Sequence, residues 1–161
     1  MKFKDLFSKW NLDSIKLNYK FAELEFSPTE YDQTAAWDMY VELVTRITTQ
    51  PLAQDEGDEA IALESVHCIF RITREILKLK GRNAENFTKI AIIVLNQIIR
   101  PFTAKWHRKK LDGAFENSAE CLNFRSELSN LQMELIKYTK LLAELAMVED
   151  LTVIMDEDDI V

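Results

Sequence analysis

Apolar residues recur with alternating spacings of four and three through the last third of the chain. The repeat consists of Phe124, Leu128, Leu131, Leu135, Tyr138, Leu142 and Leu145. A sustained seven-residue repeat predicts one long helix over residues 115–150 that packs nearly parallel to its neighbours. This seam could be buried inside a bundle or could pair with the same helix of a second subunit. Met133, Ile136 and Leu141 widen the apolar stripe, which favours burial inside the bundle.

Two further helices are predicted upstream from their start and stop signals. The first begins after Ser27, a residue that suits the N-cap position, and runs to about Gln50, where Pro51 prevents its continuation. The second covers residues 58–80 and ends at Gly81, which can adopt the left-handed conformation that closes a helix.

A third upstream helix begins near residues 83–86. It is apolar on all sides between Ile90 and Ile99, so we expect it at the centre of the bundle, with Asn96 and Gln97 hydrogen-bonded there. Pro101 should kink or end it, and a short basic helix should follow. The chain is therefore predicted to be all-α, a bundle of four to five helices.

The first 26 residues contain two different patterns. One face of a short predicted helix is formed by Phe3, Leu6, Phe7 and Trp10. We expect this face to pack on the protein's own bundle, or alternatively to dock a partner. Residues 15–21 then alternate apolar and polar, and the alternation resumes in a new phase at 24–26. This pattern predicts a short N-terminal β-strand or hairpin, which must pair with another segment or another subunit.

Length and composition fit one helical domain. The chain has 161 residues, of which 47% are hydrophobic, and contains only three glycines and three prolines. So few turn residues disfavour a many-turned sandwich or barrel. We divide the chain into an N-terminal segment packed on the bundle (1–26), the helical bundle (27–150), and a short apolar segment with an acidic tail (151–161).

Charge is distributed unevenly along the chain. The net charge is −7, which favours basic partners and disfavours a broad phosphate-binding surface. Residues 100–110 nevertheless carry five cations and no acid. The candidate partner-binding residues are Phe3, Leu6, Phe7 and Trp10 of the N-terminal face, and Lys105, Arg108, Lys109 and Lys110 of the basic segment.

Cysteine content and hydropathy predict a cytoplasmic protein. Cys68 and Cys121 are too few for a disulfide scaffold, so we expect buried free thiols. No segment reaches the roughly 18 consecutive apolar residues of a membrane span. The first ten residues do not have the pattern of a signal peptide.

No cofactor and no metal site are predicted. The three glycines are isolated, so the chain has no phosphate-binding loop. His67 and Cys68 are adjacent, and neighbouring helix positions point about 100° apart, so the two side chains are poorly placed to share an ion.

The segment from Arg100 to His107 holds the one candidate for catalysis. Six residues separate this arginine from this histidine, an arrangement that resembles the Arg-x(4–6)-His signature of the HEPN family. The resemblance implies a helical bundle in which the pair acts on an RNA phosphodiester across a homodimer. Histidine suits acid–base catalysis near neutral pH, and arginine suits bidentate phosphate binding.

Three functional hypotheses follow. The first is a protein–protein interaction module, an adaptor or regulatory subunit that self-associates or binds another protein. The alternative is a HEPN-like ribonuclease that uses Arg100 and His107, the one case in which nucleic acid is the partner. The third is an acidic inhibitor, similar to an antitoxin or immunity protein, whose tail at residues 156–159 binds a basic protein.

Overall fold

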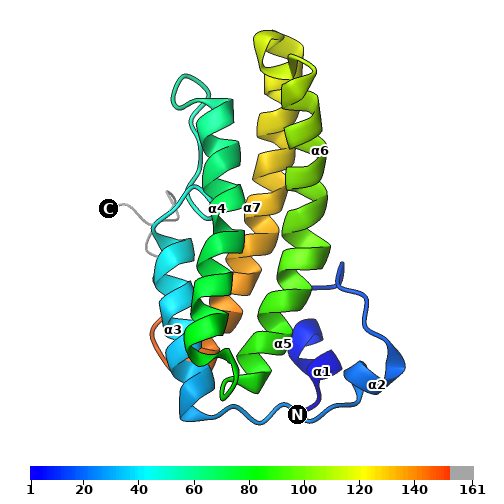
Figure 1. Ribbon diagram of the computed structural model, residues 1–161, viewed down its shortest axis with the longest axis vertical. Helices are drawn as coiled ribbons and strands as arrows, with labels where there is room; N and C mark the ends of the chain where they lie inside the picture. Colours follow the sequence, from blue (N-terminus) through cyan, green and yellow to red (C-terminus); the bar gives the residue numbers. More distant parts are fainter. Residues whose placement is uncertain (153–161) are drawn as a thin grey trace.

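The computed structural model describes residues 1–152 and is built mostly of helices (Figure 1). The α-helices are α1 (Phe3–Lys9), α2 (Tyr19–Ala22), α3 (Glu30–Val44), α4 (Glu59–Ile76), α5 (Glu85–Val94), α6 (Arg100–Leu111) and α7 (Ser118–Ala146). Two π-helical turns, η1 (Leu77–Gly81) and η2 (Leu95–Ile99), and the 3-10 turn η3 (Ala114–Glu116) complete the order. The all-α prediction is confirmed.

The bundle is formed by α3, α4, α7 and a continuous helix made of α5, η2 and α6. In Figure 1, α4 descends beside the ascending α5–α6 helix, so these two neighbours are antiparallel. The other extensive contact joins α3 to α7. This arrangement leaves α6 between two neighbours, α4 on one side and α7 on the other.

The heptad seam of α7 lies inside the bundle. All seven residues of the repeat are buried, and none is more than 6% exposed. Burial of seven large apolar side chains against α3, α4 and α6 removes them from water, which is the main favourable contribution to helix packing. The seam is therefore not a surface through which a second subunit could pair in this structure.

Helix α3 ends at Val44, earlier than the predicted end near Gln50. The hydroxyls of Thr48 and Thr49 both donate to the carbonyl of Leu43, at 3.0 and 2.8 Å. Threonine side chains that bond to backbone carbonyls in this way compete with helical hydrogen bonds. The apolar periodicity alone could not reveal that competition.

Pro101 does not end the third upstream helix. The wide π turn η2 directly precedes α6, and the backbone N–H of Arg100 donates to the carbonyl of Leu95, five residues earlier. A regular α-helical turn would bring the proline ring against the carbonyl four residues earlier. Widening the turn just before the proline lets one long helix continue through it.

The predicted N-terminal strand is absent from residues 1–152. Tyr19–Ala22 forms the helical turn α2, because the Asn18 side chain accepts a hydrogen bond from Phe21 N at 2.9 Å and caps it. The β-type pairing in this part of the chain is a single antiparallel bridge between Lys2 and Glu25. The prediction of a strand from the alternation over residues 15–21 was therefore wrong, because the Asn18 cap favours a helical turn.

The N-terminal helix face packs on the bundle. Phe3, Leu6 and Phe7 are at most 3% exposed, and Trp10 is half-buried against the same core. Phe3 also contacts the ring of Phe21, with ring centroids 4.9 Å apart. A short helix of this kind depends on tertiary contacts for its stability, which explains why its apolar face is covered. The structure does not present this face to a partner.

The amides expected in the bundle centre lie at the surface. Asn96 and Gln97 are both exposed, and Ile92 is 44% exposed, so α5–α6 is not covered on every side. The side-chain amide of Gln97 is nonetheless hydrogen-bonded: it accepts from Lys16 N at 2.8 Å and donates to Lys16 O at 2.9 Å. These bonds fasten the N-terminal segment to η2.

Cys68 and Cys121 are free thiols and are half-buried, less covered than expected. Over residues 1–152, no helix combines the length and apolarity needed to cross a membrane. The cytoplasmic location stays a prediction. The acidic tail at 156–159 lies outside the described residues.

Candidate functional site

The two histidines of the chain meet between α4 and α6. His67 and Arg74 are seven residues apart on α4, and Arg100 and His107 are seven residues apart on α6, in the reverse order. Seven residues are about two helical turns, so each pair lies on one face of its helix. Because α4 and α6 are antiparallel, the histidines lie at one end of the contact and the arginines at the other.

This arrangement encloses an open cleft of 210 Å³. Its lining consists of His67, Phe70, Arg74, Arg100, Thr103, Ala104 and His107. The imidazole rings lie edge to face, with centroids 4.8 Å apart and planes at 80°. His67 is exposed and His107 is half-buried, so a ligand from solution can reach both rings.

Arg100 is held in place by two contacts. Its guanidinium carbon lies 4.8 Å from the centre of the Phe70 ring, and its Nε donates to Asn96 Oδ1 at 3.0 Å. Such stacking orients a planar guanidinium. Its two terminal nitrogens donate to no acceptor within residues 1–152, and they are the atoms that would bind an anion.

Glu64 completes the histidine end of the cleft. One turn before His67 on α4, its Oε1 lies 3.5 Å from Nε2 of His107 and 3.8 Å from Nζ of Lys110. A carboxylate at this distance helps to orient the imidazole ring. The site therefore holds two histidines, one carboxylate and two arginines on adjacent helices.

The basic segment predicted to bind a partner is paired within the protein. Lys109 binds Glu120 at 2.6 Å, Arg108 Nε lies 3.5 Å from Asp112, and Lys110 faces Glu64. Each of these cations has a carboxylate neighbour, so the segment is not the unpaired basic surface that its sequence indicates.

Lys105, the fourth of these cations, forms an ion pair with Glu127. Burial tends to raise the pKa of the Glu127 carboxyl, but hydrogen bonds from Lys105 and Trp106 outweigh it and hold the pKa below its usual value. Glu127 is therefore an anion that the fold uses to fix α6 against α7.

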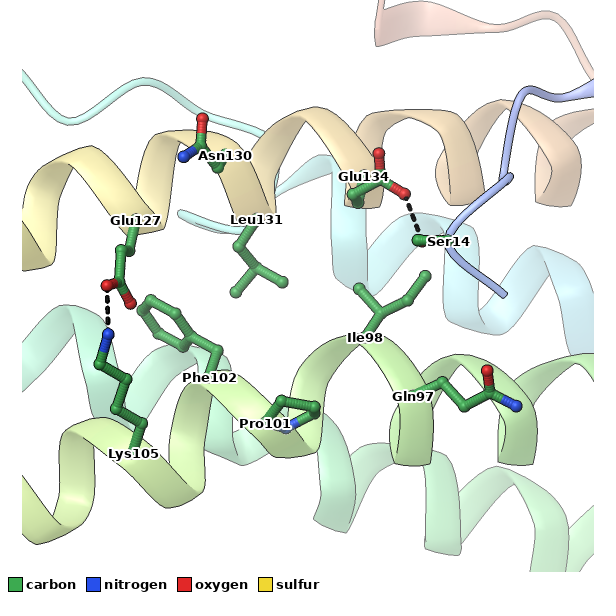
Figure 2. Close-up of a pocket in the computed structure, with 10 residues that line it drawn as sticks. All are labelled: Ser14, Gln97, Ile98, Pro101, Phe102, Lys105, Glu127, Asn130, Leu131 and Glu134. Carbon is green, nitrogen blue, oxygen red and sulfur yellow. Dashed lines mark hydrogen bonds and ion pairs between the residues drawn. The ribbon is translucent and has the colours of Figure 1, made fainter. Parts of the chain in front are cut away.

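A second depression lies on the opposite side of α6, between α6 and α7 (Figure 2). Its volume is 380 Å³, and Ile98, Pro101, Phe102 and Leu131 form its apolar floor. The Lys105–Glu127 pair borders one end, and Ser14 donates to Glu134 at 3.1 Å at the other. The lining of this α6–α7 groove contains no histidine or cysteine.

Sequence reasoning found half of the cleft. Arg100 and His107 were singled out, whereas His67 was considered only beside Cys68, and Arg74 and Glu64 were missed. The mirrored spacing, His-x(6)-Arg on one helix and Arg-x(6)-His on the next, was a signal available in the sequence. It becomes meaningful only when the two helices are known to be antiparallel neighbours.

No family model, curated protein or solved structure matches this chain. The candidate site therefore rests on its own geometry.

Proposed function

We propose that the α4–α6 cleft binds single-stranded RNA and cleaves its phosphodiester backbone. The observation that carries this proposal is that Arg100 and His107 line one open cleft, in which a second arginine–histidine pair faces them. The resemblance to the HEPN signature implied an active pair from each subunit of a dimer. Here both pairs come from one chain.

The chemistry needs one imidazole as base and one as acid. The neutral imidazole takes the proton of the ribose 2′-hydroxyl while the 2′-oxygen forms a bond to phosphorus. The other imidazole, in its protonated form, donates its proton to the 5′-oxygen as the phosphorus–oxygen bond breaks. The products are a 2′,3′-cyclic phosphate and a free 5′-hydroxyl, so protons and bonds balance.

The arginines serve the neighbouring phosphate. Arg74 and Arg100 lie about 10 Å along the helices from the histidines, at 1.5 Å rise per residue. At that separation they would hold the next phosphate of the strand while the scissile one lies on the open side of the cleft, against the exposed edges of the two imidazoles. The net charge of −7 predicts weak binding, and so few phosphate contacts predict only a modest further weakening as salt is added.

The test is cleavage of a labelled single-stranded RNA by the purified chain at low salt. We expect His67→Ala and His107→Ala each to slow cleavage about 100-fold or more, the usual range for a lost acid or base. The matched control is Lys105→Ala, on the other side of the same helix, which should change the rate less than about threefold. DNA of the same sequence should remain intact because it lacks the 2′-hydroxyl.

The proposal fails if wild type cleaves RNA no faster than a His67→Ala/His107→Ala double variant prepared in parallel. Circular dichroism of each variant establishes that its helices are intact, so that a loss of rate reports chemistry.

A second candidate function is the protein–protein interaction module, with the α6–α7 groove as its surface. The observation in its favour is the apolar floor, large enough for a side chain or two of a partner. Glu127 and Glu134 on the border outnumber Lys105, so the best-fitting partner is a segment with an apolar residue beside a cation. Asn130→Arg would block the groove at an exposed position, and a protein captured by wild type but not by this variant would support the idea.

The hypothesis that the chain self-associates relied on the heptad seam and the N-terminal face, and both are buried in the structure. Sedimentation at increasing concentration measures self-association directly. The inhibitor hypothesis rests on residues beyond 152 and stays a prediction.

A further inference from the structure

We infer that Glu64, His67 and His107 form an open binding site for a divalent transition metal, with zinc as the ion that best suits these ligands. One ligand atom from each residue lies within 4.8 Å of the other two. Imidazole nitrogen and carboxylate oxygen are common zinc ligands, and two histidines with one glutamate form a set typical of zinc sites that keep an open position.

One of the three distances between ligand atoms already fits tetrahedral coordination of a zinc ion. Ligands bound to zinc at about 2.0–2.2 Å lie roughly 3.4 Å from each other. The separation of His107 Nε2 and Glu64 Oε1 is already 3.5 Å. The other two distances, both to His67, require rotation of side chains. Glu64 and His67 can rotate because both are exposed.

The helices hold the three ligands in register. Glu64 and His67 are one turn apart on α4 and therefore adjacent on its surface. His107 follows the fully buried Trp106, which fixes this part of α6 in the bundle. Cys68 is excluded as a ligand because it points away from His67 and its sulfur accepts from Arg71 at 3.0 Å.

One cation, Lys110, contacts the site, and two arginines lie at the other end of the same cleft. Lys110 is paired with Glu64 and would give up that contact when the carboxylate binds a metal. Arg71 is bound to Glu75, whereas Arg74 and Arg100 line the same cleft. One carboxylate leaves bound zinc with a net positive charge, so the open position favours an anion over a neutral ligand. Inorganic phosphate is the simplest probe of that preference.

Zinc has a predictable effect on the proposed ribonuclease. A metal on both imidazoles occupies the lone pairs that would carry protons, so zinc should inhibit cleavage and a chelator should restore it. This regulatory consequence rests on the proposed function. Metal binding itself does not, and it is measured without RNA.

The experiment is a calorimetric titration of the full, chelator-treated chain with zinc. We expect one zinc per chain, and a weakening of at least about 100-fold in the His67→Ala and His107→Ala variants, because a lost ligand should cost at least as much as a lost neighbour of a ligand. Cys68→Ser is the matched control, since it removes the adjacent thiol and should leave affinity and stoichiometry unchanged.

A cobalt titration gives a second readout. Cobalt bound by these ligands should show the intense visible absorption of four- or five-coordinate sites, and phosphate should perturb it by entering the open position. The inference is overturned if wild type shows no saturable zinc binding, or if the double histidine variant binds zinc as tightly as wild type. Zinc binding without RNA cleavage would refute only the ribonuclease, and cleavage without zinc binding only the metal site.

Discussion

The two sides of α6 differ in how far their side chains are buried. Toward α7, Trp106 is fully buried, its ring meets Phe124 edge to face at 5.1 Å, and its Nε1 donates to Glu127 at 2.9 Å. Toward α4, His107 and Arg100 line an open polar cleft. One side therefore has packing and satisfied polar groups, whereas the other leaves charged groups accessible.

The difference shows that neighbouring cations in one basic segment have different contacts. Lys105 and Lys109 are paired with carboxylates, and their ammonium groups lie 5.6 and 5.0 Å from the centre of the Trp106 ring. They fasten α6 to the bundle. Arg100 is oriented by Phe70 but keeps its terminal nitrogens available within the described residues. The positive charges in the sequence alone would not show which cations are paired and which keep free donors within the described residues.

The sharpest test of the comparison is a pair of adjacent substitutions. Trp106→Ala should lower the free energy of unfolding by about 3–5 kcal/mol, because it removes a buried aromatic ring and leaves a cavity. His107→Ala should lower it by about 1 kcal/mol or less, because this half-buried side chain loses its edge-to-face contact with His67. Urea denaturation measures both. A large loss in His107→Ala would mean that the α4 side is structural as well.

A smaller loss is expected when the polar partner of the tryptophan is removed. Glu127→Leu leaves the indole N–H without its acceptor, which should cost about 1–3 kcal/mol. Glu127→Gln is the control, because its amide oxygen can still accept that hydrogen bond. If both variants were equally stable, the hydrogen bond would not contribute to fixing α6 against α7.

The border of the α6–α7 groove is expected to depend on Gln97. Gln97→Ala removes two hydrogen bonds to Lys16, which should cost about 1 kcal/mol at an exposed site. Amide hydrogen exchange should accelerate in residues 12–18 and stay unchanged in α7. Asn96→Ala, at the adjacent exposed position, should leave exchange in residues 12–18 unaltered. Equal acceleration in both variants would contradict the assignment.

The smallest effect concerns pH. Since the folded-state pKa of Glu127 lies below its unfolded value, the ionised carboxylate stabilises the fold at neutral pH. That contribution is lost as pH falls through the ordinary glutamate pKa of about 4.3 and below. Wild type should exceed Glu127→Gln in stability by about 0.2–1 kcal/mol at neutral pH, because the ion pair is partly exposed. The difference in unfolding free energy should shrink in acid, and a difference that grew in acid would reverse the assigned shift.

Parts of the fold were predictable because their signals are local and strong. The repeat from Phe124 to Leu145 predicted a long packed helix, and α7 contains it with its apolar face buried. Weak or short signals were less reliable. The alternation around Tyr19 predicted a strand, but a single Asn18 cap produced a helical turn instead. Pro101 predicted a kink or an end of the helix, and the π turn before it lets the helix continue.

The sequence by itself determined that this chain is helical, which faces of its helices are apolar, and that Arg100 and His107 lie seven positions apart on either side of Pro101. Tertiary structure alone decided that His67 and Arg74 stand opposite them, that the heptad seam is internal, and which cations are paired. The physical reason is the distance along the chain over which each effect acts. Helical periodicity depends on residues a few positions apart. The pairing of α4 with α6 brings together side chains 40 positions apart, and it depends on packing of the whole core.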